Sequence, residues 1–342
     1  MRAGLSEQVV QTIQTARAGS TIACYRAKWS GFQRWCEERG VDPLTCPVGD
    51  TLSFLQLLVD RGLSHATIKV YAAAISSCHE GLGGSPVFAH PLVKRFLQGV
   101  RRQRPVTRTS VPQWELPLVL EALTRDPYEP LECSSLRALS FKTALLLALT
   151  SAKRVSELCA LTVHPSCLLI RGDRSGAILK PNPSFFPKNI RSSFRSRVIQ
   201  LEAFHPPPHR DSREAKLHLL CPVRALTCYV DRTATVRTTS QLLVCYGDGT
   251  AGKALSKKRL ARWLCECIFS AYSQAGREPP IVVRAHSTRG VAASTALFSG
   301  ACVEDICTAA SWSTPCPFIR FYLLDMSGSF SRTVLTMGTQ DL

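Results

Sequence analysis

The stretch AHSTRGVAASTALFSGACVEDICTAASWSTPCPFIRFYL, residues 285–323, carries the most information about the fold of this chain. Near its start, His286 and Arg289 follow the helix-breaking pair Pro279-Pro280. On a helix, residues three apart share one face, so both side chains can approach one ligand. Arginine offers a fork to two phosphate oxygens, and histidine can donate a hydrogen bond or move a proton near neutral pH. Because so short a motif often arises by chance, its weight comes from the residues around it.

Those surrounding residues supply the parts of a phosphoryl-transfer site. An upstream run, AKRVSEL at residues 152–158, places Arg154 at the start of a short helical segment. Phosphoryl transfer mainly requires positioned positive charge around the phosphate, which Arg154 and Arg289 would provide without a metal. Tyr322 supplies a hydroxyl nucleophile that can form a covalent intermediate. No tyrosine lies between Tyr272 and Tyr322, and none follows, so the nucleophile has no close rival near the C-terminus.

In this order, the residues resemble the tyrosine recombinase (phage integrase) family. The family pattern is Arg in an R-x-x-E-L helix start, Lys in a hairpin, then H-x-x-R, then His or Trp, then Tyr. The phrases AHSTRG, AASWSTPCPFIRFYL and LCPVRAL are similar, more specifically, to recombinases of eukaryotic DIRS- and Ngaro-type retrotransposons. The resemblance covers the chain from about residue 135 onward. It covers the earlier part only by the number and position of helices.

The resemblance implies a site-specific recombinase that cleaves and rejoins DNA through a 3′-phosphotyrosine intermediate and integrates or excises a mobile element. Glu157 would orient Arg154 or its neighbours. Trp312 would donate its indole N–H to a phosphate oxygen and pack the site, and a core tryptophan is the alternative. No cofactor or metal is needed, since the phosphotyrosine link retains the energy of the backbone bond. The catalytic residues that the resemblance implies are Arg154, Lys188, His286, Arg289, Trp312 and Tyr322.

The acid that protonates the leaving 5′-oxygen is the open member of this set. The family places a lysine between the second and third strands, where Lys188 lies in a long loop rich in Pro, Ser and basic residues. Lys180, at the end of the preceding predicted strand, is the alternative. We predict Lys188, because a loop tip reaches into DNA more easily than a strand end.

Hydrophobic spacing predicts a mainly α fold. Within residues 1–104, apolar side chains recur at helical spacing in four segments, 22–36, 50–58, 64–78 and 91–100. Four short helices make a small bundle. By the resemblance, this bundle would be a SAM-like, core-binding DNA-binding domain.

A basic linker, residues 105–112, leads to the predicted catalytic domain, 113–342. That domain is expected to be mostly helical with one small antiparallel β-sheet. Turn residues separate two predicted strands, 167–171 and 177–180, and a third strand candidate is 197–201.

The charge of the chain favours a polyanionic partner, with nucleic acid first among them. Basic residues outnumber acidic ones by 42 to 25, giving a net charge of +17. Two basic runs without acidic residues are predicted to contact phosphates rather than bases, and a solvated linker or helix face is the alternative. The residues predicted to bind DNA are Lys94, Arg95, Arg101, Arg102 and Arg104 in the first run, which also contains Arg108, and Lys257, Lys258 and Arg259 in the second, which also contains Lys253 and Arg262.

The 15 cysteines include no C-x-x-C pair, and their number is odd. We therefore expect reduced thiols, mostly in the core, without a disulfide framework or a zinc site. Residues 1–14 lack the apolar core of a signal peptide, and the apolar stretch near 144–149 is too short to span a bilayer. These features predict a soluble intracellular protein without a membrane partner, and the resemblance implies the nucleus.

The resemblance also implies that two domains close around double-stranded DNA and that four protomers, a homotetramer, bring two sites together. One alternative is a catalytically decayed or domesticated copy that only binds DNA, which the complete set of Arg154, His286, Arg289 and Tyr322 disfavours. A type IB topoisomerase-like enzyme is a weaker alternative, since its long linker architecture is absent. Ala152 stands where many relatives carry glycine, which indicates a subfamily trait or a strained turn.

Overall fold

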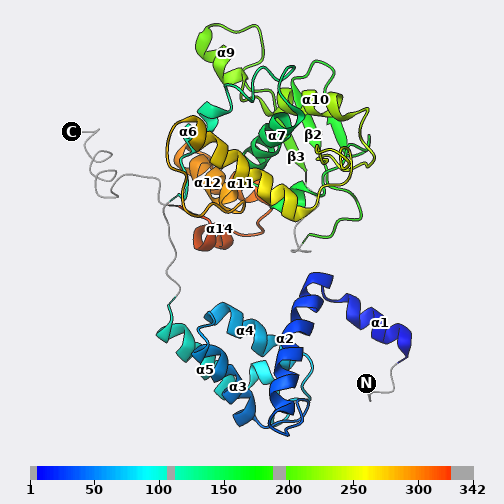
Figure 1. Ribbon diagram of the computed structural model, residues 1–342, viewed down its shortest axis with the longest axis vertical. Coiled ribbons are helices and arrows are strands. Elements are labelled where there is room, and N and C mark those ends of the chain that lie inside the picture. The colour runs from blue at the N-terminus through cyan, green and yellow to red at the C-terminus, as the bar shows by residue number, and fades with distance from the viewer. Residues whose placement is uncertain (1–5, 106–111, 188–197, 325–342) are drawn as a thin grey trace, which may run out of the picture. The chain divides into compact units, whose positions relative to one another are not determined.

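A computed structural model describes residues 6–105, 112–187 and 198–324 of the chain (Figure 1). The chain divides into two compact units, Met1–Arg108 and Thr109–Leu342, and the division falls within the predicted linker, 105–112. Each unit has its own hydrophobic core.

The first unit is helical. Its α2, α3, α4 and α5 are the four predicted helices. The additional helix α1 was not predicted, and Ser6 caps it by accepting a hydrogen bond from the Val9 amide. The elements are α1 (Glu7–Thr15), α2 (Gly19–Glu37), α3 (Val48–Asp60), α4 (His65–Ser76), the 3-10 turn η1 (Val87–Ala89) and α5 (Pro91–Gln103).

Aromatic side chains from α2 and α3 make the centre of this first core. The Phe32 ring meets the Phe54 ring edge-on, with centroids 5.0 Å apart, and Trp35 lies 5.5 Å from Phe54. Ile68 and Ile75 of α4 are completely buried against the same cluster. The apolar spacing that predicted these helices therefore also selects the faces that pack together.

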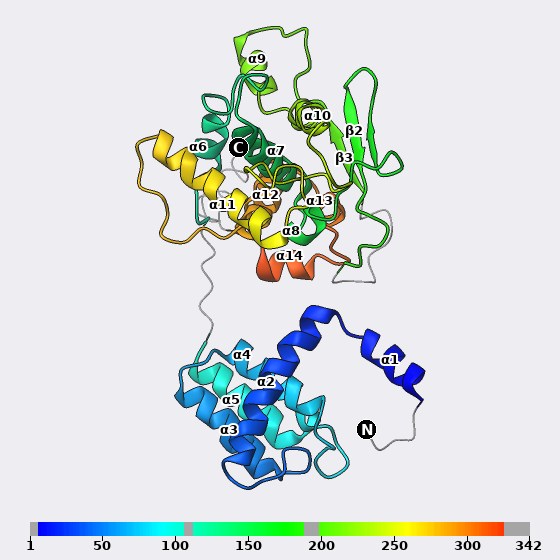
Figure 2. The ribbon, with the colours of Figure 1, turned by 45° about the vertical axis from the view of Figure 1, so that its right-hand side comes forward.

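The second unit is built around α7, a helix that is apolar on nearly all sides. Its middle, Ala144 to Ala148, is buried, and α10, α11 and α12 all pack against α7 (Figure 2). A helix without a polar face must lie inside its domain, which explains the central position of α7. The helices of the unit are α6 (Leu116–Ala122), α7 (Leu136–Ser151), α8 (Val155–Leu158), α9 (Ser212–His218), α10 (Pro222–Thr233), α11 (Lys257–Gln274), α12 (Ser287–Phe298), α13 (Val303–Ala309) and α14 (Cys316–Phe321).

The predicted small sheet is present beside α10. Its strands are β1 (Leu168–Ile170), β2 (Gly176–Leu179) and β3 (Ile199–Glu202), in the order β1-β2-β3 and antiparallel throughout. The register pairs Ile170 with Ala177 and Leu179 with Ile199. The expected fold class, mainly α with a small antiparallel sheet, is therefore confirmed.

The described residues offer neither a membrane-spanning helix nor a cluster of His, Cys, Asp and Glu suited to a metal ion. The cysteines in the described ranges are free thiols, and several of them line the two cores. Five cysteines depart from the expected core placement because their side chains are exposed: Cys24, Cys78, Cys133, Cys302 and Cys316.

Candidate active site

Four helices of the second unit bring distant parts of the sequence together. Figure 2 shows α8, α12, α13 and α14 grouped at one end of the unit, and α12 packs against both α13 and α14. Arg154 stands at the start of α8 and His286 at the start of α12. Tyr322 follows α14 directly.

A sharp turn after α7 positions Arg154. The turn residue Ala152 adopts a left-handed conformation, with φ +47°, so the strained turn considered from the sequence is present. This conformation costs an L-residue about 1–2 kcal/mol relative to the right-handed one. The Ala152 methyl is buried in a small core that includes Trp312 and Phe318, which offsets part of that cost.

Glu157 holds the two arginines of the site together. One carboxylate oxygen accepts a hydrogen bond from the Arg154 backbone amide at 2.7 Å, which caps α8. The carboxylate also lies 3.5 Å from the guanidinium of Arg154 and 3.5 Å from that of Arg289. Glu157 is predicted from the sequence to orient Arg154 or its neighbours, and in the structure its carboxylate lies near the guanidinium groups of both Arg154 and Arg289.

Arg289 is buried, with 1% of its surface exposed. Burial, together with the nearby charge of Arg154, lowers the pKa of Arg289 to about 10, so its side chain remains a cation at neutral pH. The guanidinium stacks over the rings of Trp312 and Tyr322, at 4.4 Å and 5.2 Å from their centroids. It also donates a hydrogen bond to the carbonyl of Ala310.

Two buried donors in this site lack an acceptor among the described residues: Nε of Arg289 and Nε1 of Trp312. A buried N–H without a partner costs about 1–3 kcal/mol, so native proteins rarely keep one without a function. Two such donors from stacked side chains are suited to an anionic ligand that supplies oxygen acceptors.

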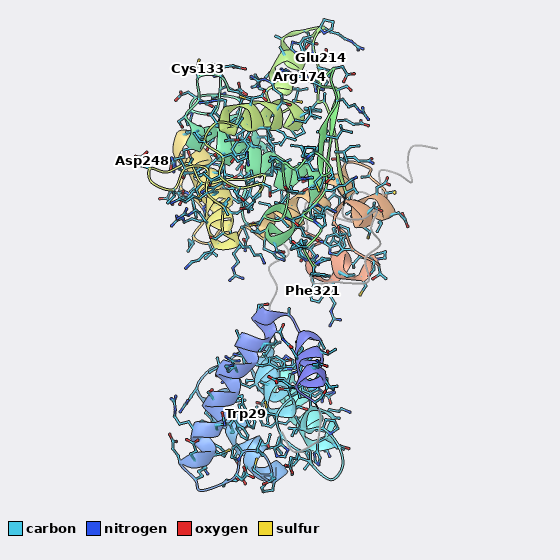
Figure 3. All side chains as sticks on the ribbon, turned by 90° about the vertical axis from the view of Figure 1, so that its right-hand side faces the viewer. Trp29, Cys133, Arg174, Glu214, Asp248 and Phe321 are labelled. Carbon is cyan, nitrogen blue, oxygen red and sulfur yellow. The ribbon has the colours of Figure 1, made fainter. Side chains whose placement is uncertain are left out.

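The Tyr322 hydroxyl lies 2.8 Å from Nε2 of His286, with the proton position set by the imidazole tautomer. The Tyr322 ring packs against Trp312, with centroids 4.8 Å apart. Its neighbour Phe321 projects from the surface with 60% of its area exposed, whereas Phe318 is buried against Trp312 (Figure 3). The end of α14 therefore turns Tyr322 inward, toward His286 and Arg289.

The two lysines considered as the general acid differ in whether the structure describes them. Lys188 lies outside the described residues, and Lys180 follows β2 directly as a half-buried residue. A further lysine, Lys153, was not predicted from the sequence: it is only 4% exposed and donates a hydrogen bond to the hydroxyl of Ser311. Its position directly before Arg154 was the available signal.

The predicted DNA-binding residues fall into two groups by their surroundings. Most are exposed, on α5 and on the first turn of α11: Lys94, Arg95, Arg101, Arg102, Lys257 and Lys258. Arg104 instead donates to the carbonyl of Leu63 at 3.3 Å, and the Arg259 guanidinium lies 2.8 Å from the Cys245 sulfur. Those two arginines have protein partners within their own unit.

Comparisons with known proteins give a sequence match and a fold match. No model of a protein family matches the chain. The chain is 25% identical over 188 residues to an integrase/recombinase XerD homologue of Selenomonas ruminantium. The match covers 50% of this chain and 52% of that protein, so the chain spans about half the length of the curated relative.

Solved structures of integrases share the fold. The Tn1549 transposon integrase in complex with transposon right-end DNA aligns with a TM-score of 0.55 and 14% identity, over 98% of each chain. A λ integrase dimer bound to a COC′ core site aligns with a TM-score of 0.53 and 12% identity, over 94% of this chain and 95% of that one. The sequence match is therefore to an integrase/recombinase over half of the chain, and the solved structures show that the chain shares the integrase fold.

Proposed function

We propose that this chain is a site-specific DNA recombinase that cleaves and rejoins DNA strands through a covalent 3′-phosphotyrosine at Tyr322. The observation that carries the proposal is the Tyr322 hydroxyl, 2.8 Å from His286 Nε2, in a site that also holds Arg289 and Arg154. A phenol next to a proton acceptor and two fixed cations is equipped to attack a phosphodiester.

The residues have distinct tasks in this reaction. With Nε2 of His286 unprotonated, the Tyr322 hydroxyl donates its proton to it as the phenol oxygen bonds to phosphorus. The bond from phosphorus to the 5′-oxygen breaks, which leaves a 3′-phosphotyrosine and a strand with a 5′-hydroxyl. Rejoining reverses these bonds, so the energy of the phosphodiester is kept without a nucleotide cofactor.

The cations and buried donors would stabilise the charge that grows on the phosphate oxygens. Arg154 and Arg289 would bind the non-bridging oxygens, and the unpartnered N–H groups of Arg289 and Trp312 would gain acceptors there. Glu157 keeps the two guanidinium groups in one place between turnovers. Lys188, with Lys180 as the alternative, would protonate the leaving 5′-oxygen.

The proposed DNA partner, oligomeric state and biological role are supported by similarity to other recombinases. The solved relatives include a λ integrase tetramer bound to a Holliday junction, which supports double-stranded DNA as the partner and a homotetramer on paired sites. The phrases that resemble DIRS- and Ngaro-type recombinases support a role in integrating or excising a eukaryotic mobile element, in the nucleus. The exposed lysines and arginines of α5 and α11 would contact DNA phosphates.

A suicide DNA substrate, nicked near the cleavage point of the element's terminal repeats, tests the proposal. Wild type should form a covalent protein–DNA adduct, and Tyr322→Phe should abolish it. Tyr272→Phe is the matched control, because Tyr272 is a buried tyrosine of the same unit whose hydroxyl accepts a hydrogen bond from the Glu115 amide. That variant should keep the adduct.

Each other outcome has a definite meaning. An adduct that survives Tyr322→Phe would show that another residue is the nucleophile. Binding of the repeats by wild type without any adduct would favour the decayed, DNA-binding alternative. For the acid, a 5′-phosphorothiolate leaving group should restore cleavage to Lys188→Ala, and failure to restore it would favour Lys180.

A further inference from the structure

Lys153 is a buried cation that the proposed chemistry leaves without a task. Its side chain is 4% exposed, although a lysine is almost never fully buried without a partner. It donates a hydrogen bond to the hydroxyl of Ser311, a residue far along the chain. The other walls around it are largely apolar, including Leu161, Pro181 and Ile199.

The two ends of this hydrogen bond belong to two left-handed turns. Lys153 follows Ala152, with φ +47°, and Ser311 itself has φ +54°. Each turn leads directly into a residue of the site, since Arg154 follows Lys153 and Trp312 follows Ser311. Left-handed non-glycine residues are unfavourable and persist where the surroundings hold them.

The charged groups near Lys153 are the groups of the site itself. Glu157 of α8 favours its charged form, while Arg289 of α12 and the adjacent Arg154 oppose it. Burial, the largest cause, and the two arginines lower the pKa of Lys153 to about 8. The ammonium form therefore predominates below about pH 8 in the free protein and is lost above it.

We propose that Lys153 is a positioning residue, whose ammonium joins the Ala152 turn to the Ser311 turn and so fixes Arg154 and Trp312 around Tyr322. The proposal rests on the proposed function, because its effect is measured on strand cleavage. Lys153 acts through Ser311 and Trp312 and does not itself touch the phosphate. Displacement of a catalytic group by about 1 Å can cost about 10²-fold in rate, which sets the size of the effect.

The test is single-turnover adduct formation on the nicked substrate by Lys153→Met, Ser311→Ala and the double variant. Lys153→Met should lower the rate constant about 10- to 100-fold, with affinity for the intact site within about twofold of wild type. Ser311→Ala should act in the same direction. The double variant should be no slower than Lys153→Met, because each single change already removes the hydrogen bond between Lys153 and Ser311.

Two further readouts separate positioning from a merely structural role. At subsaturating DNA, the ratio of the adduct-formation rate of wild type to that of Lys153→Met should be largest below about pH 8. The ratio should fall above this pH as Lys153 loses its proton. Thermal unfolding of Lys153→Met at pH 7 should occur no lower than that of wild type, because a buried charge has been removed.

Lys142→Met is the matched control, since Lys142 is a completely buried lysine on α7 with partners outside the site, Glu129 and the Leu123 carbonyl. It should destabilise the protein and leave the rate constant per folded molecule unchanged. A wild-type rate in Lys153→Met, additive losses in the double variant, or an advantage independent of pH would each overturn the proposal.

Failure of the proposed function is distinguishable from failure of this inference. If wild type forms no adduct, the proposed function fails, and urea unfolding of the same four proteins still tests the bond between the turns. Non-additive midpoint shifts would support the link between Lys153 and Ser311, and additive shifts would overturn it.

Discussion

The two units of this chain differ in what they bury. The described part of the first unit has an aromatic and aliphatic core, and none of its lysines or arginines is buried. Among its described residues, the second unit buries three cations, Lys142, Lys153 and Arg289. Because taking a charge out of water is costly, each buried cation requires a specific compensation or a function.

Two of these buried cations, Lys142 and Arg289, differ in how completely hydrogen bonds and ion pairs compensate their charge. Lys142 bonds to the Glu129 carboxylate and the Leu123 carbonyl, and Arg224 holds the same carboxylate in a bidentate pair at 2.7 and 2.9 Å. Arg289 instead lies 3.5 Å from Glu157 and keeps Nε without an acceptor among the described residues. A fully paired cation is a structural element, whereas an incompletely paired one is suited to bind a ligand.

The largest expected effect is on the rate of adduct formation, when the incompletely paired cation Arg289 is removed. Arg289→Met should slow adduct formation about 10²- to 10³-fold, because it removes a donor to the reacting phosphate. Single-turnover assays at saturating DNA measure this change. In urea unfolding, the loss of stability should be limited to the contacts that Arg289 makes with Ala310, with Glu157 and with the two aromatic rings.

Arg232→Met is its control in the same unit, because Arg232 donates to the carbonyls of Leu131 and Ser134, away from the site. It should cost stability, about 1–3 kcal/mol for carbonyls left without donors, at an unchanged rate per folded molecule. A large rate loss in Arg232→Met would contradict the distinction between the two kinds of cation.

A smaller effect, on the free energy of unfolding, tests whether the apolar side chains of the two cores are packed equally well. Ile75 in the first unit and Ile268 in the second are both completely buried. Changing either to valine should lower the free energy of unfolding by about 0.5–1.5 kcal/mol, without changing the rate of adduct formation per folded molecule. Urea unfolding measures both values, and a cost in only one unit would show that the cores pack differently.

The smallest effect concerns the backbone. Ala152→Gly should change the free energy of unfolding by less than about 0.5 kcal/mol, because relief of the left-handed strain offsets the lost methyl packing and the extra freedom of unfolded glycine. The same change at Ala74, a buried residue within α4, should cost about 1–2 kcal/mol, since no strain is relieved there. Equal losses at both positions would show that Ala152 is not strained.

Most of the fold could be predicted because its signals are local. Helices α2 to α5, α7, α10 and α11 bury apolar residues at helical spacing, and the strands alternate around a turn. The helices missed were short or polar: α6 has a proline in its first turn, and α9 has no buried residue. A helix of seven residues is too short for a clear periodic signal, even where it buries apolar residues as α6 does, and tertiary contacts decide its structure.

The sequence predicted which residues form the site, but it predicted their contacts with one another less completely. The order of Arg154, His286, Arg289, Trp312 and Tyr322 in the sequence indicated the chemistry, and the structure brings these residues together. From the sequence, Glu157 is predicted to orient Arg154 or its neighbours, without Arg289 being named, and Lys153 has no predicted role. Both roles depend on residues more than a hundred positions away in the sequence, Arg289 and Ser311.

The amino-acid sequence by itself determined the longer helices, the small sheet and the identity of the residues that carry the proposed chemistry. Spacing of apolar side chains and the types of reactive groups are properties of short segments. Only the tertiary structure decided that Arg289 stacks on Trp312 and Tyr322, that Ala152 takes a left-handed turn and that Lys153 is buried against Ser311. The burial and pairing of a charge depend on whatever surrounds it in space, and here those surroundings come from α8, α12 and the turns beside α13 and α14.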